Sequence, residues 1–138
     1  MPYARPEALV DTDWLAAHLG DQHVRVVDSS FKLPGITPTA REDYNRAHIP
    51  GAVFFDIDDI CEPGTRQLKS ADELTRLFGD AGVALDRPIV TSCGSGVTAC
   101  ALAFALHLIG HPGAAVYDGS WSEWGLPGDT PIETGPAW

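Results

Sequence analysis

The segment RPIVTSCGSGVTACALAFALHLIG, residues 87–110, places a cysteine between an apolar strand and an apolar helix. Its first part, residues 87–93, is a continuous apolar run of the kind found in central strands of parallel sheets. From Val97 to Ile109 it carries no formal charge, and it stops at a Gly-His-Pro sequence, which predicts a buried core helix. That run is too short to cross a bilayer, which takes about 20 residues. A strand, a Gly-rich turn and a helix in this order are typical of an α/β sheet.

The remainder of the chain alternates short strands with helices. Asp11 or Thr12 is suited to begin the first helix and Gly20 to end it, while Ser70 and Glu73 have capping-box spacing. The expected strands are residues 24–28, 49–58 and 114–119, and the other expected helices are residues 40–48, 70–83 and 120–125, the last with a second capping box at Ser120 and Glu123. This alternation predicts a single α/β domain with a mostly parallel central sheet and helices on both faces.

The net charge and the cysteine content argue against several classes of partner and site. The 138 residues carry a net charge of −10, so we expect no nucleic-acid partner and no binding to anionic membranes. The first ten residues lack the apolar core of a signal peptide, which favours the cytoplasm. Three cysteines with no CxxC pair predict neither a disulfide framework nor a structural metal site.

Cys93 has three competing interpretations: a buried structural residue, a metal ligand or an activated nucleophile. Gly94 and Gly96 allow the backbone to curl so that several N–H groups point inward. The helix that begins near Val97 adds unpaired N–H donors and the positive end of its dipole. A thiol in such a cradle is held as thiolate, with a pKa below the free value of about 8.5. The pattern favours the nucleophile, with the buried structural residue as the alternative.

Two further motifs connect this loop to a known family. The sequence VTSCGSGVTACALAFALHLIG, followed by VYDGSWSEWG, resembles the catalytic domain of the 3-mercaptopyruvate sulfurtransferases in the rhodanese superfamily. AHIPGAVFFDIDDI is a second rhodanese-like signature, and the resemblance runs from about Leu9 to Gly135. Residues 1–138 then form a single rhodanese-like domain. Its N-terminal half resembles the family's inactive first domain, and its C-terminal half resembles the catalytic second domain. The two halves would join at a seam near residues 61–67.

The resemblance implies sulfur transfer through a persulfide on Cys93. The donor would be 3-mercaptopyruvate or thiosulfate, and the acceptor cyanide or a thiol such as thioredoxin or a small thiol. No cofactor and no metal are implied. The loop expected to hold the persulfide consists of Gly94, Ser95, Gly96, Val97 and Thr98. Ser95 is neutral where thiosulfate-preferring members tend to be basic, which favours mercaptopyruvate.

The resemblance also points to two cations that would bind the donor's carboxylate. The family's active domain has two arginines before its HIPG motif. Counting back from His48, Arg41 stands at the spacing of the second and Lys32 at that of the first. A lysine lacks the planar fork of arginine and should bind less tightly. His48 itself is expected to support the turn before Pro50.

Two other function classes also use a cysteine loop of this kind. A cysteine phosphatase needs an arginine six residues after the nucleophile, where this chain has Ala99. A weakly catalytic rhodanese-type sulfur carrier or binding module is the stronger rival. We expect Cys100 in the core, and we expect Trp121 and Trp124 to form an open patch beside the loop. A second copy would cover that patch in a homodimer.

Overall fold

The computed structural model describes residues 3–19, 24–112 and 114–136, so the expected helix end at Gly20 lies outside the described residues. Its centre is a five-stranded sheet with the order β1-β5-β4-β2-β3. The strands are β1 (Leu9–Val10), β2 (Arg25–Asp28), β3 (Val53–Phe54), β4 (Ile89–Ser92) and β5 (Ala114–Tyr117). Every neighbouring pair in this order is parallel, as the alternating sequence pattern predicted.

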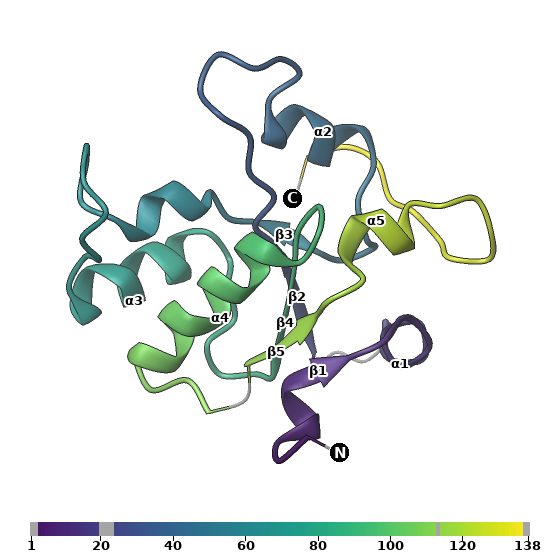
Figure 1. Ribbon diagram of the computed structural model, residues 1–138, viewed down its shortest axis with the longest axis horizontal. Coiled ribbons are helices and arrows are strands. Elements are labelled where there is room, and N and C mark those ends of the chain that lie inside the picture. The colour runs from purple at the N-terminus through teal and green to yellow at the C-terminus, as the bar shows by residue number, and fades with distance from the viewer. Residues whose placement is uncertain (1–2, 20–23, 113, 137–138) are drawn as a thin grey trace.

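Helices cover both faces of the sheet. The α-helices are α1 (Thr12–His18), α2 (Ala40–Arg46), α3 (Ala71–Asp80), α4 (Val97–Leu108) and α5 (Ser120–Trp124), and the short 3-10 helices are η1 (Pro6–Ala8) and η2 (Ile57–Ile60). Figure 1 shows α3 and α4 on one side of the sheet and α1, α2 and α5 on the other. The expected single α/β domain is confirmed.

Alternation along the strands divides the core into two halves. Val27 and Ile89 are fully buried on the face covered by α3 and α4. Their chain neighbours Val26 and Val90 are buried on the opposite face, with α1, α2 and α5. Successive side chains of a strand point to opposite faces, so a continuous apolar run supplies both halves.

Helix starts follow the chemistry of their capping residues. The Asp11 side chain accepts a hydrogen bond from the backbone of Trp14, which confirms Asp11 as the N-cap of α1. The Ser70 hydroxyl accepts one from the backbone N–H of Glu73, as the spacing predicted. Each such cap satisfies a donor that the helix itself leaves unpaired.

The expectation of a wholly buried α4 was wrong. Ala99, Leu102, Ala105 and Leu106 are buried, but Phe104 is 56% exposed and other residues of the same helix also face solvent. Cys100 is exposed as well, so the prediction that it belongs to the core was wrong. In a mostly apolar helix whose polar residues are only Thr98 and His107, the periodic signal is too weak for the buried stripe to be predicted from the sequence.

Two other parts of the chain differ from, or add to, the sequence-based expectation. The short edge strand β1 was not predicted, because two residues carry too little periodicity to be recognised. Residues 61–68, which include the seam expected near residues 61–67, form a compact loop. An isolated antiparallel bridge between Cys61 and Leu68 closes it, with the Glu62 N–H donating to the Gln67 carbonyl at 2.8 Å.

Candidate active site

Three loops that follow neighbouring strands meet around Cys93. In the sheet register Asp28 pairs with Ser92, so β2 and β4 end side by side, and β5 ends on the other side of β4. Cys93 comes directly after β4 and is 2% exposed. In open parallel sheets, ligands bind beyond the carboxyl ends of the strands. The cysteine therefore stands where this fold places its chemistry.

Hydrogen-bond donors surround the Cys93 sulfur. The backbone N–H of Gly96 donates to Sγ at 3.0 Å. Burial acts to raise the pKa of the Cys93 thiol, but hydrogen bonds outweigh it and lower the pKa below its ordinary value. The donors are the Thr98 hydroxyl and the backbone N–H groups of Ala99, Gly96 and Ser95. The cradle expected from the glycines is present, and it consists of dipoles rather than charges.

Thr98 has two acceptors within reach and one proton to give. Its hydroxyl donates to the backbone carbonyl of Ser29 at 2.7 Å, which ties the loop after β2 to the first turn of α4. The same hydroxyl is a donor to the Cys93 sulfur. Turning its proton towards the sulfur stabilises a thiolate at the cost of the bond to Ser29. Thr98 can therefore stabilise a negative charge on Cys93, as expected of a residue of the loop.

Gly96 begins α4 in a conformation that other residues rarely adopt. Its φ is +97°, and a Cβ built there would lie 2.8 Å from the backbone carbonyl oxygen of Asp118. The loop after β4 therefore approaches the loop after β5 closely enough to exclude a methyl group. Glycine meets both requirements, the left-handed backbone and the close approach.

The segment after β5 contacts the cysteine loop directly, and here one expectation was wrong. Ser120 does not form a capping box with Glu123, since the N-cap of α5 is Gly119 and no side chain caps the helix. The Ser120 hydroxyl is instead buried, donates to the Tyr117 carbonyl and accepts from the Cys93 N–H at 3.1 Å. The sequence motif DGSW marked the segment without revealing this contact.

The two tryptophans of this segment do not form an open patch. Trp124 is fully buried, and its indole N–H donates to the Pro131 carbonyl at 2.7 Å. Trp121 is partly buried against the same half of the core. The expectation of an exposed pair was wrong because aromatic residues near a site can equally serve as its packed support.

A cavity of about 400 Å³ opens between the loop after β2 and the start of α2. Arg41 lines it, with the guanidinium carbon 4.6 Å from the centre of the Phe54 ring. Lys32 lines it too, so the structure places the two predicted carboxylate ligands at one cavity. Sequence reasoning missed that three carboxylates, Asp56, Asp58 and Asp59, line the same space. Cys93 is not among the lining residues; Ser30, next to the Thr98-bound Ser29, is.

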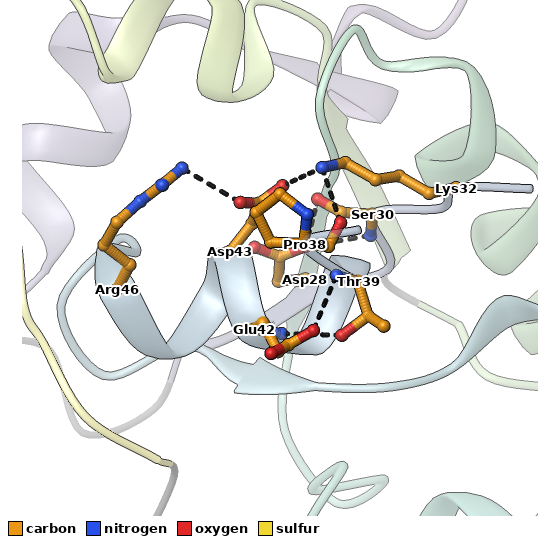
Figure 2. A network of polar contacts seen from close by, with 8 residues as sticks. All are labelled: Asp28, Ser30, Lys32, Pro38, Thr39, Glu42, Asp43 and Arg46. Carbon is orange, nitrogen blue, oxygen red and sulfur yellow. Dashed lines mark hydrogen bonds and ion pairs between the residues drawn. The ribbon is translucent and has the colours of Figure 1, made fainter. Parts of the chain in front are cut away.

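Lys32 is already engaged with its neighbours. Its ammonium group donates to the Pro38 carbonyl at 2.9 Å and forms an ion pair with Asp43, which also pairs with Arg46 (Figure 2). The capping box of Thr39 and Glu42 fixes the start of α2 in the same network. Lys32 therefore contributes little net positive charge to the cavity.

Two further ionisable side chains near the strand ends have structural partners. The His48 ring is buried, stacks on Tyr44 and lies 3.3 Å from a Glu133 carboxylate oxygen, so it supports the turn as expected. Burial raises the pKa of Asp28, although Ser30 donates both its N–H and its hydroxyl to that carboxylate. Neither residue contacts the Cys93 sulfur in any hydrogen bond of the described structure.

Comparison with known proteins places this arrangement in a family. Residues 11–126 match the family described as the rhodanese-like domain. The chain belongs to the rhodanese family. This confirms the resemblance drawn from the cysteine loop and the AHIPG signature.

Individual rhodanese relatives agree with this assignment. The chain is 38% identical over 130 residues to the 3-mercaptopyruvate sulfurtransferase of Escherichia coli, covering 93% of this chain and 46% of that protein. It is 44% identical over 107 residues to the thiosulfate sulfurtransferase of Gallus gallus, covering 78% and 37%. The crystal structure of SseA from Escherichia coli, described as a 3-mercaptopyruvate sulfotransferase, superposes with a TM-score of 0.84 at 24% identity, covering 94% and 52%.

This rhodanese chain spans about half the length of the curated relatives it matches, or less. In the described part of the chain, no helix is long and apolar enough to cross a membrane. Nor do the residues described here contain a group of three or more His, Cys, Asp or Glu side chains that could hold a metal ion.

Proposed function

We propose that this rhodanese domain is a sulfurtransferase that carries a sulfane sulfur on Cys93. The observation that carries the proposal is the placement of that thiol at the end of β4, with the Gly96 N–H 3.0 Å from the sulfur and the pKa lowered. A thiolate is the reactive form of cysteine. The names of the relatives, 3-mercaptopyruvate and thiosulfate sulfurtransferase, support the same chemistry.

The reaction would proceed by double displacement. The Cys93 thiolate attacks the sulfur of 3-mercaptopyruvate, the carbon–sulfur bond breaks, and its electron pair leaves on pyruvate as the enolate, which takes up a proton. Cys93 is then a persulfide whose outer sulfur the loop N–H groups can hold. An acceptor thiolate, or cyanide, attacks that outer sulfur and releases the Cys93 thiolate. Such covalent catalysis by a thiol of lowered pKa requires neither metal nor cofactor.

The charge around the site favours 3-mercaptopyruvate over thiosulfate as donor. No lysine or arginine occurs between Cys93 and the C-terminus, so the loop has no cation of its own. Ser95, the central residue of the loop, is neutral. Thiosulfate is a dianion, whereas mercaptopyruvate brings one carboxylate. The three carboxylates in the neighbouring cavity repel a dianion about twice as strongly as a singly charged donor, and the loop offers no cation to offset that repulsion.

Within this proposal Arg41 is the main ligand for the donor's carboxylate. Its guanidinium lies over the Phe54 ring and lines the cavity, and a guanidinium can bind a carboxylate through two parallel hydrogen bonds. Lys32 takes a smaller part, because Asp43 and the Pro38 carbonyl already hold its ammonium group. We further propose a thiol acceptor, such as thioredoxin or a small thiol, and a cytoplasmic site of action.

A weakly catalytic sulfur carrier is the second candidate function. The feature in its favour is the cavity itself, where Asp56, Asp58 and Asp59 offset the charge of Arg41. A carrier would accept sulfur on Cys93 from another persulfide but would turn over mercaptopyruvate slowly. The comparison of the two donors therefore separates a carrier from an enzyme.

The test is mass spectrometry of the intact protein after treatment with each donor, followed by cyanide. We expect one added sulfur atom on Cys93, its removal by cyanide, and faster loading by mercaptopyruvate than by thiosulfate. Cys93→Ser should lose both loading and transfer. Cys100→Ser is the matched control, because that thiol is exposed on α4 and lies outside the cradle. Sulfur transfer that survives in Cys93→Ser would contradict the proposal.

A further inference from the structure

The segment after β5 holds the Cys93 loop through its main chain. The Trp121 N–H donates to the Cys93 carbonyl at 2.8 Å, and the Ser122 N–H donates to the Gly94 carbonyl at 2.8 Å. The Ser122 hydroxyl donates to that same Gly94 carbonyl at 2.7 Å. Two donors from a single residue thus converge on one peptide group of the cysteine loop.

That peptide group also carries a donor to the sulfur. The Gly94 carbonyl and the Ser95 N–H belong to one planar, trans peptide, so they point in opposite directions. The Ser95 N–H is one of the groups that lower the pKa of Cys93. When Ser122 fixes the carbonyl on one side, the N–H on the other side is directed at the sulfur.

The location of Ser122 sets it apart from an ordinary serine of a first helical turn. Serine hydroxyls near a helix start usually accept a hydrogen bond from their own helix, whereas α5 has no side-chain cap. The Ser122 hydroxyl donates to a residue 28 positions away in the chain. Gly94 and Ser95 are exposed, so without this hydroxyl water could compete for the carbonyl and the peptide could turn.

We propose that Ser122 is a positioning residue that orients the Gly94–Ser95 peptide so that its N–H faces the Cys93 sulfur. The inference rests on the proposed role of Cys93 as the sulfur-carrying nucleophile. Ser122 itself touches neither the donor nor the sulfur in this assignment. It acts through the peptide whose N–H faces the sulfur.

The experiment measures the pKa of Cys93 directly, from thiolate absorbance near 240 nm as a function of pH. Subtracting the titration of Cys93→Ser, made in each background, removes the signals of Cys61 and Cys100. For Ser122→Ala we expect the Cys93 pKa to rise by about one unit, a tenfold smaller thiolate fraction at pH values below the pKa. Ser122→Thr, which keeps the hydroxyl, should restore the wild-type pKa.

Ser70→Ala is the matched control for a purely structural effect. It also removes a serine hydroxyl from the start of a helix, but at α3, away from the cysteine loop. We expect it to lower the midpoint of urea unfolding and to leave the pKa of Cys93 unchanged. If Ser122→Ala also lowers stability without moving that pKa, the positioning role is refuted.

The titration does not depend on turnover, so it separates this inference from the proposed function. A protein whose Cys93 pKa shifts as expected, but which takes up no sulfur from either donor, supports the positioning role and contradicts the sulfurtransferase. A wild-type pKa at the value of a free thiol would overturn the inference, because no thiolate would then need to be oriented.

Discussion

Replacing Gly96 with alanine tests how tightly the cysteine loop is confined. The backbone at Gly96 has φ +97°, and the added methyl carbon would lie 2.8 Å from the carbonyl oxygen of Asp118. That oxygen belongs to the backbone and cannot swing aside as the end of a side chain can. Alanine at this position therefore strains the local backbone and also pushes the two loops apart.

The two costs can be separated by a second variant. Gly110 follows α4 with φ +90°, and a methyl carbon added there would meet no atom of the described residues within 4 Å, so Gly110→Ala carries the backbone cost alone. That cost is about 1–2 kcal/mol. Forcing a methyl group into a packed contact adds about 1–3 kcal/mol. We therefore expect Gly96→Ala to be about 2 kcal/mol less stable than Gly110→Ala.

Urea unfolding and steady-state kinetics give the two readouts. A difference of about 2 kcal/mol corresponds to about 1 M in the urea midpoint for a protein of this size. Because the Gly96 N–H donates to the Cys93 sulfur, Gly96→Ala should also lower kcat/KM by about tenfold or more, equivalent to at least one pKa unit of thiolate stabilisation. Gly110→Ala should keep full activity. Equal unfolding midpoints and equal activities for the two variants would refute this account of the loop.

The titration of Cys93 and Asp28, the binding of the donor and the oligomeric state can each be tested by a separate measurement. Because the pKa of Cys93 is lowered, a plot of kcat/KM against pH should reach its plateau at a pH below the pKa of a free thiol. In urea unfolding, the wild type should gain stability over Cys93→Ser as the pH rises from the pKa of Cys93 in the folded protein to its pKa in the unfolded chain. Arg41→Ala should raise KM for mercaptopyruvate more than it lowers kcat, and unchanged kinetics would contradict a role for Arg41 in donor binding. Burial raises the pKa of Asp28, so its carboxylate costs stability once the pH exceeds the pKa of the unfolded chain. Urea unfolding should therefore show that Asp28→Asn gains more stability over the wild type at pH 7 than at pH 4. The expected homodimer has lost its structural basis, since Trp121 and Trp124 form no open patch; sedimentation at assay concentration tests it, and a fully active monomer would exclude it.

Local chemistry made much of the fold predictable. The apolar run before Cys93 indicated a central parallel strand, and Asp11 and Ser70 marked helix starts that the structure confirms. Which residues of α4 are buried could not be predicted in this way. Cys100 and Ala99 are adjacent, uncharged and small, yet one faces solvent and the other the sheet. Only contacts with distant strands decide which face of such a helix is covered.

The candidate site shows the same division between local and distant information. The glycines flanking Ser95 indicated a curled backbone, and the N–H groups found at the sulfur follow from it. The function of Ser120 could not be foreseen, because its spacing to Glu123 equally fits a capping box. What redirects its hydroxyl is the Cys93 N–H, which reaches it from a neighbouring strand end. Long-range pairing of this kind leaves no local signature in the chain.

Stabilising a thiolate with dipoles alone has a consequence for which donors the site accepts. A cation beside the sulfur would lower its pKa and would attract every anion, with the strongest pull on dianions. N–H and O–H groups act over a much shorter range, so they stabilise the thiolate without drawing in a second charge. The acidic cavity and the net charge of −10 then oppose dianions from a distance, while Arg41 can hold one carboxylate at close range. Under the proposed function, selection for a singly charged donor would therefore depend on the absence of cations at the loop as much as on the presence of Arg41.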